Sequence, residues 1–197
     1  MGVSLQKGQK ISLSKESGST LTQISMGLGW DANTQKKSGI LGFFGGGGGE
    51  IDLDASCLMF DAAGKLADAI WFQQLRSKDG SIQHTGDNVS GQGEGDDERI
   101  LVDLSRIPGS VSALVFVVNS FTGQSFESVR NSFCRLVNAV NNQEIARYQL
   151  EQTQGKHTAL IMVKLYRHEG DWKMHAIGEP SKGKTFHEML PAITAVL

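Results

Sequence analysis

The fold is decided by residues 86–104, which read Gly-Asp-Asn-Val-Ser-Gly-Gln-Gly-Glu-Gly-Asp-Asp-Glu-Arg-Ile-Leu-Val-Asp-Leu. Its first part, residues 86–98, holds five carboxylates, one Asn and four glycines, with no Lys or Arg to neutralise them. Carboxylates this close repel each other unless water separates them or a cation gathers them. Ca²⁺ accepts about six to eight oxygen ligands, and glycine lets backbone carbonyls turn inward beside the carboxylates. The stretch therefore predicts a calcium loop, with a solvated acidic turn as the alternative.

The spacing within this loop excludes an EF-hand. Residues 87–98 match the length of such a loop, with an acid at each end. Its third and fifth positions are Val89 and Gly91, and its sixth, where an EF-hand needs glycine, is Gln92. Residues 100–104 are short and β-branched, which is typical of a strand and not of an exiting helix. Any calcium site here is therefore built on a β-sheet.

A second acidic cluster precedes the loop along the chain. Residues 50–54, Glu-Ile-Asp-Leu-Asp, alternate acid and apolar residues, so a strand would place Glu50, Asp52 and Asp54 on one face. This face is either a metal site or simply exposed to water. Asp31 closes another short apolar segment, where it could reach the same end of the sheet or cap a turn.

The rest of the chain is made of short apolar runs separated by turns. We expect strands at residues 11–13, 24–26, 51–60, 69–72, 100–104, 114–118, 133–137, 144–150, 159–167 and 172–177. Ser125 could cap a short helix through Ser132, and residues 185–197 predict a terminal helix interrupted by Pro191. The pattern indicates a mainly β protein, a two-sheet β-sandwich with one or two short helices and the acidic loops at one end.

Length and charge limit the class of protein. The 197 residues suit one domain, spanning 1–197, and the net charge of −2 without a basic stripe argues against a nucleic-acid partner. Residues 1–7 lack the apolar core of a signal peptide, and no run approaches the roughly 18 apolar residues of a membrane span. We therefore expect a cytoplasmic protein, and attachment to the inner membrane surface stays open.

The residues that could carry catalysis are scattered. Cys57 and Cys134 lie in strand-like apolar runs and are expected to be buried free thiols, although a redox role is the alternative. His84 could stand behind the acidic loop or be a plain surface histidine. No Ser or Cys nucleophile is paired with a histidine by its spacing, so we expect a protein that is not an enzyme.

Residues 36–49 form a Gly/Phe-rich insertion in which Phe43 and Phe44 precede a run of five glycines. A polyglycine run loses too much conformational entropy to hold a structure of its own. The insertion is either an apolar tip for a membrane surface or protein partner, or a loose connection between two strands.

The sequence resembles the TerD domain of bacterial tellurium-resistance proteins, and the insertion is most similar to the TerZ branch of that family. The resemblance rests on runs spread over nearly the whole chain: residues 27–31 (Gly-Leu-Gly-Trp-Asp), 52–56 (Asp-Leu-Asp-Ala-Ser), 84–88 (His-Thr-Gly-Asp-Asn), 91–98, 133–138 (Phe-Cys-Arg-Leu-Val-Asn), 146–148, 165–168 and 172–173. It implies a calcium-binding β-sandwich, with more than one Ca²⁺ ion expected.

The resemblance also implies a set of ligands and a biological setting. The metal ligands would be Asp31, Asp52, Asp54, Asp87, Asn88, Asp96, Asp97 and Glu98, with Gly91 and Gly93 supplying carbonyls or turns. The chain would be a calcium-binding sensor or scaffold of a tellurite-resistance and stress-response system linked to phage and colicin tolerance. Its partners would be other proteins of that system. The alternative is a metal-dependent enzyme or a thiol protein that acts on tellurite directly.

Overall fold

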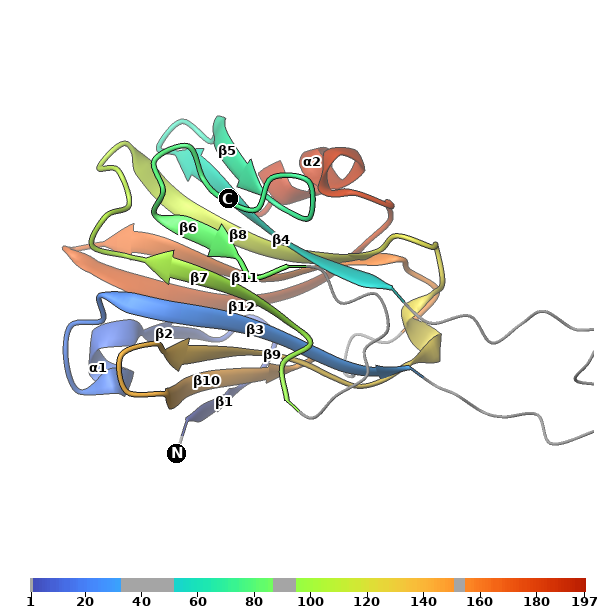
Figure 1. The fold of residues 1–197 in the computed structure, drawn as a ribbon, viewed down its shortest axis with the longest axis horizontal. Coiled ribbons are helices and arrows are strands. Elements are labelled where there is room, and N and C mark those ends of the chain that lie inside the picture. Colours follow the sequence, from blue (N-terminus) through green and yellow to red (C-terminus); the bar gives the residue numbers. More distant parts are fainter. Residues whose placement is uncertain (1, 33–51, 87–94, 151–154) are drawn as a thin grey trace, which may run out of the picture.

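The computed structural model describes residues 2–32, 52–86, 95–150 and 155–197, and folds them into two stacked six-stranded sheets (Figure 1). Sheet A has the order β1 (Val3–Leu5), β10 (Gln143–Gln149), β9 (Val129–Asn138), β3 (Gln23–Ala32), β7 (Glu98–Asp103), β6 (Ile82–His84). Sheet B has the order β2 (Lys10–Ser12), β12 (Asp171–Ser181), β11 (Ala159–His168), β8 (Val111–Ser120), β4 (Leu53–Asp61), β5 (Leu66–Ile70). The predicted two-sheet β-sandwich is confirmed.

Alternation along the strands divides the side chains between the interior and the outer faces. On β3, Leu28 and Trp30 are buried between the sheets, while Gly27 and Gly29 alternate with them. On β4, Leu53, Ala55, Cys57 and Met59 join the same interior cluster. This interior is the main core of the molecule.

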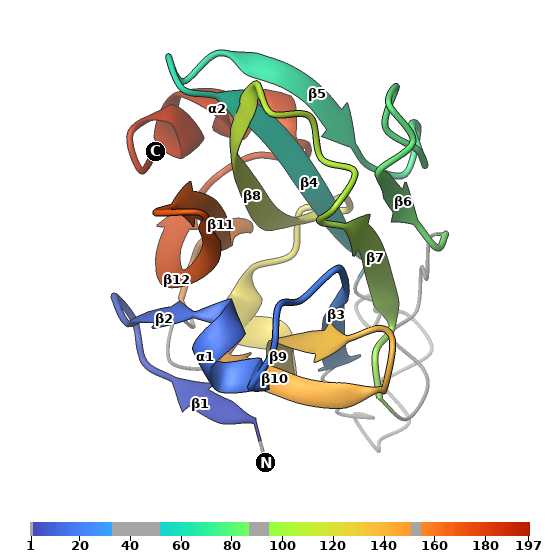
Figure 2. The same cartoon turned by 90° about the vertical axis from the view of Figure 1, so that its left-hand side faces the viewer.

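Sheet B is buried on its outer face as well, because helix α2 (Phe186–Thr194) covers it (Figure 2). Phe186, Met189 and Ile193 of α2 pack in one cluster with Leu58 and Phe60 of β4. A strand covered on both sides has no solvent face, so β4 and β8 read as continuous apolar runs. The predicted terminal helix is confirmed, with Pro191 inside it.

Two local predictions were wrong. The expected helix from Ser125 to Ser132 is only a 3₁₀ turn at Phe126–Ser128, and Ser125 makes no side-chain cap hydrogen bond. From Val129 onward the chain joins β9 and pairs with β3, because the sheet offers each backbone group a partner. Residue 13, expected in a strand, begins helix α1 (Leu13–Ser17), whose Lys15 N–H donates to the Ser12 hydroxyl.

The two strands that the sequence did not indicate, β1 and β6, are three residues long and lie at opposite edges of sheet A. Helix α1 contacts both β12 of sheet B and β10 of sheet A, so it closes one side of the sandwich (Figure 2). Within the described ranges, no helix is both long and apolar enough to cross a membrane.

Candidate functional site

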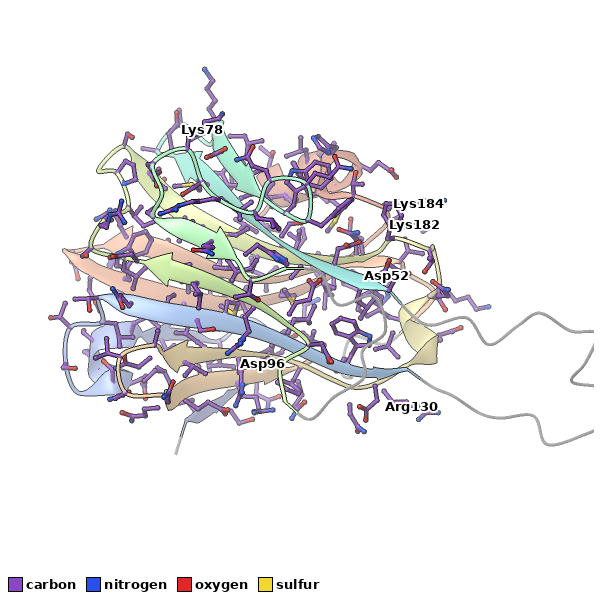
Figure 3. All side chains as sticks on the ribbon, in the orientation of Figure 1. Asp52, Lys78, Asp96, Arg130, Lys182 and Lys184 are labelled. Carbon is purple, nitrogen blue, oxygen red and sulfur yellow. The ribbon has the colours of Figure 1, made fainter. Side chains whose placement is uncertain are left out.

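Strand β3 ends, and β4, β7 and β9 begin, toward the same end of the sandwich, and the candidate acids lie on or next to these strand ends (Figure 1). Antiparallel pairing makes this happen: Leu28 near the end of β3 pairs with Glu98 at the start of β7, and Asp31 pairs with Arg130 at the start of β9. Figure 3 shows Asp52 and Arg130 at this end of the molecule. The sheet topology therefore collects acids that are far apart in the sequence.

The glycines of the Gly27-Leu28-Gly29 run provide the surface on which residues 95–97 lie. We call these three residues the acidic segment. A Cβ placed on Gly27 would stand 2.3 Å from Cγ of Asp96, and one on Gly29 would stand 2.6 Å from the carbonyl oxygen of Gly95. Real side chains do not tolerate such distances. Asp97 adds a backbone hydrogen bond from its N–H to the Leu28 carbonyl, 2.8 Å long. Only glycine at positions 27 and 29 lets residues 95–97 lie against β3.

Asp96 has a basic partner that the local sequence did not reveal. Nε of Arg135 lies 2.6 Å from Oδ1 of Asp96, and Nη2 lies 3.1 Å from Oδ2, which is a two-point ion pair. Arg135 also bonds Glu144 at 3.3 Å, and Glu144 bonds Arg147 at 2.8 Å. The carboxylate of Asp96 is thus the first member of a chain of alternating charges across β9 and β10, and it anchors the acidic segment to sheet A.

Asp97 lies in an unfavourable electrostatic position for an ionised carboxylate. Burial raises the pKa of its carboxyl, and the nearby charges of Asp31 and Asp96 raise that pKa further, against the hydrogen bond from the Trp30 N–H. That N–H donates to Oδ2 of Asp97 at 2.9 Å. Asp31 is exposed, and its Oδ2 accepts a hydrogen bond from Nδ2 of Asn131. The carboxylate of Asp97 therefore lies within electrostatic range of those of Asp31 and Asp96 at this corner of sheet A.

Glu98 connects the two sheets. It lies on β7 of sheet A, is 1% exposed, and its Oε2 accepts a 2.7 Å hydrogen bond from the backbone N–H of Ala55 on β4 of sheet B. His84 stands beside it, with Nε2 3.5 Å from the same carboxylate oxygen. Nδ1 of His84 accepts from the Gly86 N–H, so a neutral ring carries its proton on Nε2, facing Glu98. His84 is 2% exposed, which excludes the plain surface histidine.

Asp54, from the second acidic cluster, belongs to a different sheet. Asp54 is buried at 3% exposure on β4, so an exposed acidic face is wrong for this residue. Its Oδ2 accepts from Nδ2 of Asn119 at 3.1 Å, and the same amide donates to the Lys184 carbonyl at 2.7 Å. Asp52 precedes β4, and its carbonyl accepts the Phe121 N–H. The structure therefore brings Asp31, Asp96 and Asp97 together on sheet A and keeps Asp54 on sheet B.

Part of the predicted ligand set lies outside the described residues, namely Asp87, Asn88, Gly91 and Gly93, as do Glu50 and the insertion at 36–49. Within the described residues, no three His, Cys, Asp or Glu side chains converge in a way that could hold a metal ion. The side chains of Asp31 and Asp97 themselves offer only oxygen ligands. Oxygen ligands fit a hard cation such as Ca²⁺ and not the softer metals that prefer nitrogen or sulfur.

The two cysteines lack the properties of reactive thiols. Cys57 and Cys134 are free and fully buried. Burial raises the pKa of Cys134 to about 12, and burial together with the Asp68 charge raises that of Cys57 well above its usual value. Thiolate chemistry needs the opposite, a lowered pKa and access to solvent. The expectation of buried free thiols is confirmed.

Comparison with known proteins places the chain in a family. The TerD domain model matches residues 1–191. The chain is 50% identical to the tellurium resistance protein TerZ of Serratia marcescens over 95% of this chain and 94% of that protein. It is 39% identical to the stress response protein SCP2 of Bacillus subtilis, covering 96% and 98%. A solved homologue of the telluride resistance protein TerD from Streptomyces coelicolor shares the fold, with a TM-score of 0.66 at 19% identity over 83% of this chain and 92% of that one. The chain belongs to the TerD-domain family of tellurium-resistance and stress-response proteins.

Proposed function

We propose that the acidic end of the sandwich binds Ca²⁺ and that the protein acts as a non-catalytic sensor or scaffold in a tellurite-resistance and stress response. The observation that carries the proposal is the raised pKa of Asp97, caused by burial and by the charges of Asp31 and Asp96. Folding has placed like charges where they destabilise one another. A divalent cation at this corner would attract these carboxylates and offset their mutual repulsion, which favours its binding.

We propose different roles for the individual acids. Asp31 and Asp97 are the candidate direct ligands on sheet A, and residues 87–94 would supply the others, as the sequence suggests. Asp96 is held by Arg135 and acts as the anchor of the loop. Glu98, bound to the Ala55 N–H, would couple the loop to sheet B. Asp52 and Asp54 are the candidates for a second ion, and the stoichiometry of binding decides whether they hold one.

Calorimetric titration of the metal-free protein with Ca²⁺ in excess Mg²⁺ tests this proposal. We expect saturable binding that Asp97→Asn weakens by at least about tenfold, because a charged oxygen ligand is removed while the side chain keeps its shape. The matched control is Glu16→Gln, which removes the same charge from an exposed position on helix α1 at the other end of the sandwich. Absence of binding in the parent chain would refute the calcium site and leave a solvated acidic end.

A sensor or scaffold must bind at least one partner protein. We place the protein in the cytoplasm and propose that the calcium-bound end recruits other proteins of the resistance system, because binding would order the acidic end, where Glu98 links the two sheets. The support is the family itself, whose members include tellurium-resistance and stress-response proteins. Affinity capture with and without Ca²⁺ checks this: the parent chain should retain partners only with Ca²⁺, and Asp97→Asn should not. Equal capture in all conditions would contradict the proposal.

A further inference from the structure

A cavity of about 240 Å³ opens at the other end of sheet A. Its walls come from the first residues of β3, the turn before β6 and the end of β7. Strand β7 runs from Glu98 to Asp103, so the acidic end and this cavity lie at opposite ends of one strand. The residues that matter for its chemistry are Arg76, Ser81, Leu101, Asp103 and Arg106.

Two guanidinium groups meet at Gly80 in the wall of this cavity. A Cβ placed on Gly80 would stand 3.5 Å from Nε and Nη2 of Arg76 and 3.5 Å from Nη2 of Arg106. Within the described residues, neither arginine has a carboxylate oxygen within 4.0 Å. Among the described residues, the hydrogen bond that these guanidinium groups make is a long one, from Nη2 of Arg106 to the Asp79 carbonyl at 3.5 Å. The positively charged guanidinium groups of Arg76 and Arg106 thus lie close together, and most of their N–H donors are available to bind a ligand.

The acids beside the cavity are satisfied by neutral donors. Oδ1 of Asp103 accepts from the N–H of Ser105 at 3.1 Å and from its hydroxyl at 2.5 Å. Oδ1 of Asp79 accepts from the Ser77 hydroxyl at 3.0 Å and from the Ser81 N–H at 2.7 Å. These carboxylates offset the positive charge of the arginines. Recognition of an anion here would therefore depend on directed guanidinium donors and not on a strong net field.

We propose that this cavity binds a small ligand through a phosphate-type oxyanion group held between Arg76 and Arg106. Guanidinium forks match the paired oxygens of such groups and bind them through two parallel hydrogen bonds. Ser81 also lines the cavity, and its hydroxyl oxygen is buried beneath the surface of the wall. Leu101, 38% exposed, adds an apolar wall beside the charged groups. The volume suits inorganic phosphate or a small organic phosphate, since drug-sized ligands take about 300 Å³ or more.

Nuclear magnetic resonance of the parent chain, titrated at constant ionic strength, tests the proposal with inorganic phosphate and with phenyl phosphate. Saturable shifts should appear at the side-chain Nε–H signals of Arg76 and Arg106 and at the Gly80 amide, with a dissociation constant on the order of 1 mM. Arg76→Gln and Arg106→Gln should each weaken binding by about tenfold or more, because each removes a charged hydrogen bond. Leu101→Ala should weaken phenyl phosphate alone if the apolar wall contacts an organic group, and leave both unchanged if the free ion is the ligand.

The control for general charge effects is Lys78→Gln. Lys78 lies two positions after Arg76, is exposed, and points away from the sandwich (Figure 3). Its removal should change the dissociation constant less than twofold. The proposal is overturned if phosphate causes no saturable shift at either arginine, if binding survives unchanged in both arginine variants, or if Lys78→Gln weakens it as much as they do.

Discussion

The carboxylate of Asp96 occupies the space where a side chain on residue 27 would stand, so Gly27 is what allows Asp96 to reach Arg135 across β3. The strand order places β3 between β9, which carries Arg135, and β7, which begins two residues after Asp96. The link between the acidic segment and sheet A thus requires that residue 27 be glycine, which has no side chain.

Gly27→Ala should break this link. The added Cβ would lie 2.3 to 2.5 Å from three atoms of the Asp96 carboxylate, so the carboxylate must move away from Arg135. We expect the free energy of unfolding to fall by about 1–3 kcal/mol, the usual cost of overpacking a fitted site. Urea denaturation measures it. Gly109→Ala is the control, because nothing lies within 4 Å of its Cβ position. Equal stability of the two variants would show that the contact between Gly27 and Asp96 is not formed.

Asp97→Asn should stabilise the calcium-free protein near neutral pH. The pKa of Asp97 is raised in the folded state by burial, with Asp31 and Asp96 adding to the effect. An acid whose folded pKa exceeds its unfolded value binds more protons in the folded state, so stability falls as pH rises through that window. The advantage of the variant should therefore be greatest above the raised pKa and disappear below about pH 4, near the unfolded value.

Thermal unfolding in the presence of a calcium chelator, followed across this pH range, checks the sign. Glu16→Gln, at an exposed position on helix α1, should show no comparable pH-dependent gain. A loss of stability in Asp97→Asn at neutral pH would mean that the charge of Asp97 is favourable without metal, against the electrostatic account.

A second close contact lies between the two sheets. A Cβ on Gly178 of β12 would overlap the hydroxyl of Tyr148 on β10. Gly178 also has φ +60°, a backbone conformation that residues with a Cβ adopt only with strain. The Tyr148 hydroxyl is buried and has no hydrogen-bond partner among the described residues. Gly178→Ala should therefore be severely destabilising, by about 2 kcal/mol or more, whereas Tyr148→Phe should be neutral or stabilising.

Combining these two changes in a double-mutant cycle should recover part of the loss, because removing the hydroxyl relieves one of the clashes. Denaturant unfolding of the four proteins measures the coupling. Strict additivity would show that the alanine acts through backbone strain alone.

The cysteines provide a test of the thiol alternative. Cys57 and Cys134 are fully buried, and burial is the largest cause of the raised pKa of each thiol. We expect no reaction with a colourimetric disulfide reagent at about pH 8 in the folded protein, and full reaction of both in denaturant. Rapid reaction of either cysteine in the folded state would make direct thiol chemistry tenable again.

The sequence was sufficient for the sandwich but located β3 poorly. Residues 24–26 were expected as a strand, whereas β3 continues to Ala32. Glycines at positions 27 and 29 lower the strand propensity of this segment. They are required by the close contact with residues 95 and 96, which exists only in the tertiary structure.

For the candidate site, the sequence singled out acids that the structure places on two different sheets, and it did not predict that division. The pairing of Asp96 with Arg135 spans 39 residues and follows from strand order, which no local pattern contains. Asp54 was expected on an acidic face, yet outward-facing positions of sheet B are covered by α2 and the segment before it. The burial of His84 follows from its place under Glu98, again a contact between elements.

The most direct measurement of the central claim is a Ca²⁺ titration followed by amide resonances. The account predicts saturable shifts at the backbone amides of Trp30 and Asp97 and at the side-chain amide of Asn131, with none at Gly18 beside α1 at the other end of the sandwich. If Ca²⁺ produces no saturable change at these three groups, or if the changes are largest away from them, then the acidic corner of sheet A does not bind calcium.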